Sequence, residues 1–143
     1  MKDKRIVARG IIFIDNKVVL LKRIRACKDK YLHYYAIPGG GVENNETIEA
    51  ACIREVKEEV SLDVEIIKYL GMEEYETGIC HYFKVKYQGG KPILGGEEKE
   101  NNNPDNYYEV VLVDVDKLDN IYIYGQGIEM IKKAYKQFSW LST

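Results

Sequence analysis

The sequence predicts an α/β protein, or a closely related α+β one, in which helices pack on a mixed β-sheet. Segments rich in β-branched and aromatic residues alternate along the chain with segments of helical spacing, as such folds require. The chain has 143 residues, 45% of them apolar. A chain of this size buries about two-thirds of its unfolded surface and needs no disulfide or metal in order to fold. We therefore expect one domain that spans residues 1–143.

The chain is expected to begin with a β-hairpin. Residues 5–14 and 18–24 are rich in Ile and Val, and Asp15 and Asn16 between them favour a turn. The basic residues that follow, from Lys22 to Lys30, are expected to form a loop.

The middle of the chain is expected to hold a helix and a second hairpin. Residues 47–60 combine strong helix formers with apolar residues at helical spacing. Residues 64–75 and 79–87 are expected to be strands, and Thr77 and Gly78 between them favour a hairpin turn.

The last third is expected to hold a loop, a strand and a helix. Residues 89–106 are polar and contain two Gly-Gly pairs, and a loop of that length is either functional or mobile. Residues 107–113 are predicted to form a strand, and residues 127–138 an amphipathic helix.

Charge and cysteine content exclude several classes of protein. The 21 basic and 23 acidic side chains leave a net charge of −2, which argues against electrostatic wrapping of nucleic acid. No apolar run approaches the ~20 residues that span a bilayer, and residues 1–10 lack the apolar core of a signal peptide. Cys27, Cys52 and Cys80 form no C-x-x-C pair, and His33 and His81 are isolated. We therefore expect a reducing, cytoplasmic location and no thiolate or imidazole metal site.

The predicted helix over residues 47–60 carries acidic residues where a core-facing surface is expected. The apolar stripe consists of Ile48, Cys52, Ile53, Val56 and Val60. At about 100° of rotation per residue, Glu59 falls inside this stripe and Glu55 lies at its edge. Burying a carboxylate costs on the order of several kcal/mol unless an opposite charge neutralises it. That charge is either a neighbouring basic side chain or a divalent metal. With Glu58, the turn offers three carboxylates, which suit Mg²⁺ or Mn²⁺.

The segment from Gly40 to Leu62 closely resembles the Nudix box. The family pattern is Gly, five residues, Glu, seven residues, Arg-Glu, an aliphatic residue, any residue, Glu-Glu, any residue, Gly and an aliphatic residue. This chain matches the pattern at Gly40, Glu46, Arg54, Glu55, Val56, Glu58, Glu59 and Leu62. Ser61 departs from it, because the pattern has Gly at the helix exit. A left-handed serine there costs about 1 kcal/mol but removes no ligand and no base.

The resemblance implies a Nudix-type α/β/α sandwich around a mixed β-sheet. It also implies metal-dependent hydrolysis of a phosphoanhydride bond in a nucleoside diphosphate linked to another moiety, by attack of water on phosphorus. Divalent metals favour such chemistry because they screen the phosphate charges and lower the pKa of bound water.

The resemblance also implies roles for individual residues. The implied ligands of Mg²⁺ or Mn²⁺ are Glu58 and Glu59, with help from Glu55 and the Gly39 carbonyl. The implied catalytic residues are Glu55, Glu58 and Arg54. Glu55 is the candidate for orienting or deprotonating the water, and Arg54 would hold the glutamates by charge-assisted hydrogen bonds. Gly40 and Glu46 would shape the loop.

A second stretch resembles the family outside the box. Gly95-Gly96-Glu97-Glu98, followed by Asn106 and Tyr108, is similar to a Gly-Gly-Pro-Glu…Asn-x-Tyr stretch of many small Nudix proteins. This similarity implies that Glu98 is a further metal ligand, although Glu97 replaces the proline. The alternative is a solvated glutamate in a polar loop.

The sequence leaves the identity of the nucleotide open. Tyr34 or Tyr35, just before the box, could form a platform for a nucleobase, although tyrosines in strands more often serve packing. The basic residues that could contact phosphates are Lys22, Arg23, Arg25 and Lys28. The ADP-ribose-cleaving branch of the family often has a proline shortly after its box. This chain has none between Pro38 and Pro92, which disfavours that branch.

Two other functions of the same fold stay open. A nucleotide-sensing Nudix domain binds its ligand without hydrolysing it, but such domains tend to lose box glutamates, and this chain keeps all of them. An isomerase acting on a diphosphate ester usually needs a catalytic cysteine, for which Cys52 and Cys80 are the candidates. The hydrolase hypothesis implies a small-molecule nucleotide as partner, with no membrane and no stable nucleic-acid binding. A homodimer fits the resemblance, because small Nudix proteins often pair.

Overall fold

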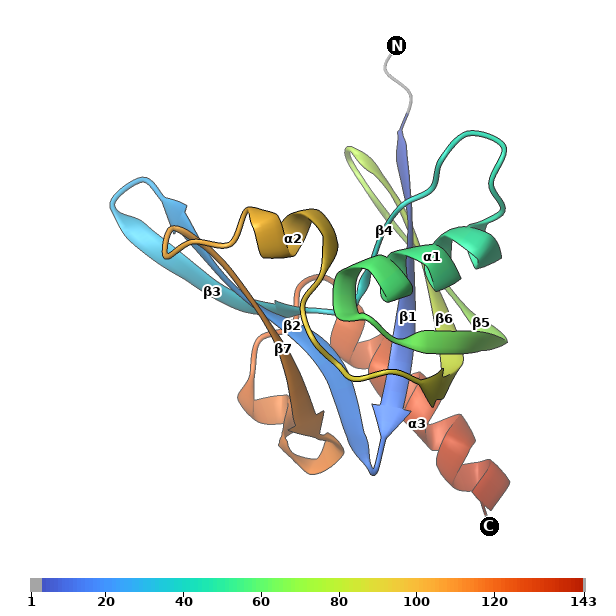
Figure 1. Ribbon diagram of the computed structural model, residues 1–143. Coiled ribbons are helices and arrows are strands. Elements are labelled where there is room, and N and C mark those ends of the chain that lie inside the picture. The colour runs from blue at the N-terminus through green and yellow to red at the C-terminus, as the bar shows by residue number, and fades with distance from the viewer. Residues whose placement is uncertain (1–3, 143) are drawn as a thin grey trace.

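The computed structural model describes residues 4–142 and the side chains of residues 4–136. Within these residues, a seven-stranded mixed sheet has helices on both faces (Figure 1). The strands are β1 (Arg5–Ile14), β2 (Lys17–Cys27), β3 (Lys30–Ala36), β4 (Gly39–Gly41), β5 (Asp63–Tyr75), β6 (Gly78–Gly89) and β7 (Asn106–Asp114). The helices are α1 (Ile48–Val60), α2 (Gly96–Glu100), the short 3-10 helix η1 (Val115–Asn120) and α3 (Gly127–Ser142).

The sheet has β1 at its centre. The strand order is β3-β2-β1-β6-β5, with β4 paired to β1 and β7 paired to β2. β1 runs parallel to β6, and the other pairings are antiparallel. Beyond its short pairing with β1, β2 continues as the middle strand of a three-stranded extension of the sheet, between β3 and β7. The fold is therefore the mixed-sheet α/β architecture that the sequence predicts.

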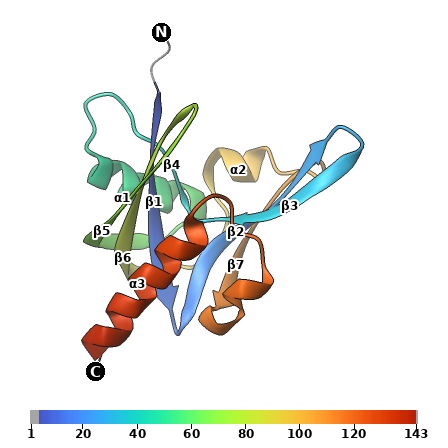
Figure 2. The ribbon, with the colours of Figure 1, turned by 180° about the vertical axis from the view of Figure 1, so that it is seen from behind.

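Side chains from the two faces of β1 pack into two separate hydrophobic cores. Its residues alternate between them, with Val7 and Ile11 facing one core and Ala8 and Ile12 facing the other. The first core includes Ile131 and Ala134 of α3. The second includes Ala51, Cys52, Val56 and Val60 of α1. Figures 1 and 2 show α1 and α3 on opposite faces of the sheet, which gives the expected three layers.

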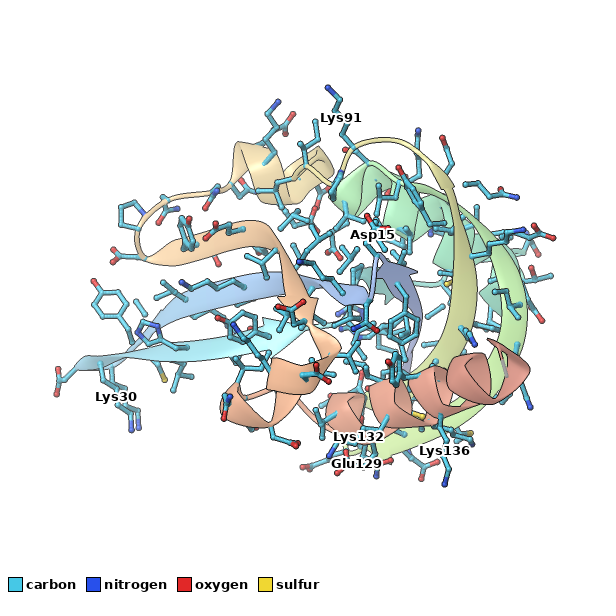
Figure 3. The ribbon with its side chains drawn as sticks, turned by 90° about the horizontal axis from the view of Figure 1, so that it is seen from below. Asp15, Lys30, Lys91, Glu129, Lys132 and Lys136 are labelled. Carbon is cyan, nitrogen blue, oxygen red and sulfur yellow. The ribbon has the colours of Figure 1, made fainter. Side chains whose placement is uncertain are left out.

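The predicted hairpins are confirmed. Phe13 pairs with Val18 across the first turn, where Asp15 and Asn16 adopt left-handed φ values of 49° and 64°. Tyr75 pairs with Gly78 across the second. The last predicted helix is present as well, and Figure 3 shows Glu129, Lys132 and Lys136 on its outer side. Among the described residues, no helix is long and apolar enough to cross a membrane.

One predicted loop is wrong, and a second contains a short helix. The basic segment from Lys22 to Lys30 is not a loop, because β2 continues to Cys27 and turns at Lys28 directly into β3 (the tip near Lys30 in Figure 3). These strands extend beyond both cores, so polar side chains are tolerated on both of their faces. The polar segment from residue 89 to residue 106 contains the helix α2.

Candidate active site

Helix α1 has well-defined ends, which fix the direction of its acidic side chains. The Thr47 side chain accepts a hydrogen bond from the Ala50 N–H at 3.0 Å and caps the N-terminus. Ser61 ends the helix with a left-handed φ of 64°, the conformation in which the family pattern has glycine. Its hydroxyl donates to the Ile93 carbonyl at 3.0 Å, which offsets part of the cost of that conformation.

Arg54 is the centre of a network of hydrogen bonds. Its guanidinium binds Glu46 with two parallel bonds, Nε to Oε2 at 2.7 Å and Nη2 to Oε1 at 2.9 Å. It also donates to the Gly41 carbonyl at 3.0 Å, to Glu55 at 2.9 Å and to Glu58 at 3.2 Å. The hydrogen bonds from Arg54 lower the pKa of Glu46 to about 2. Arg54 thus ties the loop before α1 to two glutamates on the helix.

Glu59 is a buried carboxylate. Its side chain is only 6% exposed, as its position inside the apolar stripe predicts. The Gly39 N–H donates to Oε1 at 3.0 Å. Burial raises the pKa of Glu59 to about 8, although the Gly39 hydrogen bond and the positive charge of Arg9 act in the opposite direction. A positive charge near this carboxylate would therefore be strongly favoured.

Glu55 and Glu58 lie in different environments. The Glu55 side chain is 18% exposed, and burial raises its pKa. A Cβ atom built on Gly40 would collide with the Glu55 carboxylate, which explains the glycine at that position. Glu58 is 54% exposed and accepts a hydrogen bond from Arg54.

Arg54, Glu55, Glu58 and Glu59 open onto one cleft of about 880 Å³. The residues proposed as metal ligands line the same cleft, namely Gly39, Glu55, Glu58, Glu59 and Glu98. We call the four glutamates the carboxylate side of the cleft. Glu98 comes from α2, which lies next to the end of α1 because the Gly95 N–H donates to the Glu59 carbonyl at 3.0 Å. The structure therefore brings the predicted site residues together.

The chemistry of the carboxylate side fits a hard divalent cation. Carboxylate oxygens are the ligands that Mg²⁺ and Mn²⁺ prefer, and a cation would compensate the charge that burial disfavours on Glu59. Within the part of the chain that the structure describes, no group of three or more acidic, His or Cys side chains is arranged closely enough to hold a metal ion by itself. An open arrangement suits Mg²⁺, which usually binds through a few carboxylates and keeps several waters.

The other side of the cleft is formed by planar side chains. Tyr34 on β3, Arg23 on β2 and Tyr108 on β7 lie in register across three adjacent strands. The Arg23 guanidinium lies 3.7 Å from the centre of the Tyr108 ring and 5.8 Å from that of Tyr34. It also donates to Asn106 Oδ1 at 2.6 Å. The Tyr124 ring centre lies 6.0 Å from that of Tyr34. We call Tyr34, Arg23, Tyr108 and Tyr124 the planar side of the cleft.

The candidates for substrate contacts divide into two groups. Tyr34, Arg23 and Arg25 line the cleft. Tyr35 instead packs against the core beside α3. Lys22 and Lys28 are not among the described residues that line the cleft.

The sequence prediction missed several residues of the cleft. These are Arg5, Arg9, Tyr75 and Tyr124. Arg9 donates to the Ile37 carbonyl at 2.7 Å and interacts with the charge of Glu59. A basic residue within the apolar strand 5–14 was the available signal for Arg9. Tyr124 carries no such signal, because its place depends on a long-range contact.

Comparison with known proteins finds the same family that the box residues indicate. The family model of the NUDIX domain matches residues 4–132. An ADP-ribose pyrophosphatase of Methanocaldococcus jannaschii is 43% identical over 63 residues, which are 44% of this chain and 36% of that protein. An RNA pyrophosphohydrolase of Pelagibacter ubique is 38% identical over 89 residues, covering 56% of this chain and 52% of that protein. The chain thus spans about half or less of the length of these curated relatives.

Solved structures share the fold. A MutT NUDIX hydrolase from Burkholderia pseudomallei has a TM-score of 0.70 at 21% identity and covers 90% of this chain and 97% of its own. A NUDIX hydrolase from Nitrosomonas europaea has a TM-score of 0.72 at 17% identity, covering 94% and 90%. Because the family model matches residues 4–132 and Gly40, Arg54, Glu55, Glu58 and Glu59 line one cleft, this chain belongs to the Nudix family.

Proposed function

We propose that this protein is a pyrophosphohydrolase that cleaves a phosphoanhydride bond of a nucleoside diphosphate linked to another moiety, by attack of water on phosphorus. The observation that carries the proposal is the buried Glu59, which shares a cleft with Glu55, Glu58, Glu98 and several arginines. The carboxylates supply oxygen ligands for a cation, and the arginines supply positive charge for phosphates.

Mg²⁺ or Mn²⁺ would be held by Glu58 and Glu59, with Glu55, Glu98 and the Gly39 carbonyl as further ligands. When bound, the cation would screen the phosphate charges and lower the pKa of a coordinated water. The protein itself contributes the orientation of the carboxylates. Because Arg54 holds both Glu55 and Glu58, it fixes their directions before any substrate binds.

Glu55 is our candidate for the group that orients or deprotonates the attacking water. Its pKa is raised by burial, and a carboxylate with a raised pKa is a better proton acceptor near neutral pH. One of its oxygens accepts from Arg54, and the carboxylate lies against Gly40, which also lines the cleft.

The structure disfavours the isomerase alternative. Cys52 is completely buried between α1 and β1, and burial raises the pKa of its thiol to about 12. Cys80 is also buried, and its pKa is raised too. A buried thiol with a raised pKa is a poor nucleophile. The nucleotide sensor remains the alternative to hydrolysis, and turnover separates the two.

The substrate class stays within nucleotide derivatives. Relatives of this chain are named for ADP-ribose, for RNA and for 8-oxo-dGTP. A substrate panel should therefore contain nucleoside triphosphates, an oxidised triphosphate, nucleotide sugars, dinucleotides and a triphosphorylated RNA.

The test is release of phosphate and pyrophosphate from this panel with Mg²⁺ or Mn²⁺. Glu58→Gln should reduce turnover by about 10²–10³-fold, the usual effect of removing one electrostatic stabiliser from an active site. Glu49→Gln is the matched control, because Glu49 is exposed on the same helix and outside the cleft. Binding of nucleotide and metal without turnover of any panel member would favour the sensor.

A further inference from the structure

The segment 90–95, which connects β6 to α2, is tied to the C-terminal end of α1. A helix end leaves carbonyl groups without partners inside the helix, and here the segment supplies donors for two of them. The Ile93 N–H donates to the Val60 carbonyl at 3.2 Å, and the Gly95 N–H donates to the Glu59 carbonyl at 3.0 Å. In Figure 1 the segment passes this end of α1 just before it enters α2. The start of α2 is therefore placed by α1.

Ser61 adds a third hydrogen bond to this attachment. Its hydroxyl donates to the Ile93 carbonyl at 3.0 Å. The family pattern has glycine at this position, so the hydroxyl is a feature of this chain and not of the pattern. The Ile93 side chain is 59% exposed, whereas Leu94 beside it packs against the core next to α1. The segment is thus anchored by the backbone of Ile93 and the side chain of Leu94.

Two glycines bring the end of the segment very close to α1. A Cβ atom on Gly95 would come within 2.7 Å of the Glu58 carbonyl oxygen, and one on Gly96 within 3.2 Å of the same oxygen. Gly96 also has a left-handed φ of 63°. Gly95 has a φ of −140°, so at that position only the close approach to α1 requires glycine. The first residues of α2 therefore lie against the turn of α1 that carries Glu58.

This close approach brings the Glu98 carboxylate to the carboxylates of α1. Glu98 Oε2 would lie 3.4 Å from the same Cβ on Gly96 that approaches the Glu58 carbonyl. Glu98 is half-buried, whereas the other glutamates of α2 are exposed. Burial raises the pKa of Glu59 to about 8, and the charge of Glu98 acts in the same direction. Glu98 is thus within electrostatic reach of the buried carboxylate.

We propose that Ser61 is a positioning residue whose hydroxyl fixes the segment 90–95 to α1 and thereby holds Glu98 in place as a ligand of the divalent cation. The inference rests on the proposed function, because it takes the carboxylate side of the cleft as the cation site. Glu58 and Glu59 are placed by α1 itself. Glu98 comes from a helix of five residues, which is too short to be stable alone, so its position depends on how the segment before it is attached.

The test measures the affinity for Mn²⁺ by electron paramagnetic resonance of the free ion, without substrate. Ser61→Gly restores the residue of the family pattern and relieves the left-handed conformation, yet it should weaken Mn²⁺ binding by about 2- to 10-fold. This range corresponds to the net contribution of one hydrogen bond. Ser61→Ala should weaken it by a similar factor. Ser61→Thr keeps the hydroxyl and should bind Mn²⁺ within about twofold of the wild type, although a β-branched residue in this conformation lowers stability.

The order of the Ser61 variants separates positioning from stability. A merely structural role predicts that Mn²⁺ affinity follows the free energy of unfolding, so that Ser61→Gly binds more tightly than Ser61→Thr. The positioning role predicts the opposite order. Mn²⁺ affinity that is higher in Ser61→Gly than in Ser61→Thr, or equal in Ser61→Gly and the wild type, would overturn the inference.

Glu98→Gln tests whether Ser61 acts through Glu98. In the Glu98→Gln background, Ser61→Gly should change Mn²⁺ affinity less than about twofold, because the segment then carries no charged ligand. An equal loss in both backgrounds would mean that Ser61 acts on another ligand, against the inference. Ile93→Ala is the matched control, because it removes an exposed side chain and keeps the backbone groups that bind α1. It should bind Mn²⁺ like the wild type.

Gly95→Ala tests the attachment without changing the helix exit. Its Cβ would meet the Glu58 carbonyl and push the segment away from α1, so Mn²⁺ affinity should fall, again only while Glu98 is present. Unchanged affinity in this variant, or a wild-type protein that binds no Mn²⁺, would contradict the inference. These measurements need no turnover, so a protein that binds Mn²⁺ in the expected order but hydrolyses nothing would refute the proposed function and leave this inference standing.

Discussion

The two sides of the cleft are built in different ways. On the carboxylate side, Arg54 binds Glu46, Glu55 and Glu58, which lie within eight residues of it in the sequence. On the planar side, Arg23 binds Asn106, which lies 83 residues away. One side is a compact hydrogen-bonded network on one amphipathic helix and the loop before it. The other side joins two half-buried rings and a guanidinium from three strands with an exposed ring from a connecting segment. A short motif can therefore specify the carboxylate side, whereas the planar side depends on the assembled sheet.

This difference predicts that substitutions on the carboxylate side lower kcat, whereas substitutions on the planar side weaken nucleotide binding. Arg54→Lys should have a larger effect on turnover than any change on the planar side, because lysine cannot form the paired bonds to Glu46 and still reach Glu55 and Glu58. We expect kcat to fall about 10- to 100-fold, as is usual when a partner that orients metal ligands is lost. Steady-state kinetics measures this fall in kcat, with the substrate of the panel that the wild-type protein turns over fastest. A loss confined to KM would contradict the assigned role.

Arg23→Lys should affect the planar side alone. Lysine removes the guanidinium plane beside Tyr108 and the bond to Asn106, so nucleotide binding should weaken by about 2- to 30-fold. kcat at saturating substrate should stay close to that of the wild type. Lys22→Arg, next along β2 and outside the cleft, is the control. If kcat fell as far as in Arg54→Lys, the two sides would not be separable.

The pairing of Arg54 with Glu46 predicts a defined pH dependence of stability. The pKa of Glu46 is about 2 in the folded protein, against an ordinary value of 4.5 for this side chain, so the unfolded chain binds the proton more readily. The stabilisation is therefore fully present above pH 4.5 and is lost as the pH falls toward 2. The stability difference between wild type and Glu46→Gln should shrink over this window, as urea unfolding at several pH values will show. A difference that stays constant down to the lowest pH would exclude this linkage.

Substitution of Ser61, where the chain departs from the family pattern, should have the smallest effect on folding, and that effect is on the free energy of unfolding. Ser61→Gly relieves the left-handed conformation but removes the hydrogen bond to Ile93, so the free energy of unfolding should change by less than about 1 kcal/mol. Ser61→Ala keeps the strain and loses the bond, and should be less stable than Ser61→Gly by about 1 kcal/mol. Thermal unfolding of the two variants measures the difference. Equal stabilities would mean that the helix exit relaxes.

Much of the carboxylate side could be predicted from the sequence. The 100° rotation per residue placed Glu59 inside the apolar stripe of α1, and its side chain is buried there. The hydrogen bonds of Arg54 follow from spacings along one helix and the loop before it. The expected left-handed conformation at residue 61 is also present. Glu98 was placed by resemblance, and its position in the cleft depends on the packing of α2 against the end of α1.

The basic segment from Lys22 to Lys30 shows where the prediction failed. Its charges favoured a loop, but cross-strand pairing with β3 and β7 makes most of it a strand. That pairing in turn places Arg23 between Tyr34 and Tyr108.

The sequence by itself determined the alternation of strands and helices, the acidic face of α1 and the family. These depend on local periodicity, in which neighbours three or four residues apart meet whatever the rest of the chain does. The tertiary structure decided which tyrosines reach the cleft, that Arg9 lies near Glu59, and that the segment before α2 is tied to the end of α1. Those contacts depend on strand register and on closing long loops, and a register shift of one residue would turn every side chain of a strand to the opposite face.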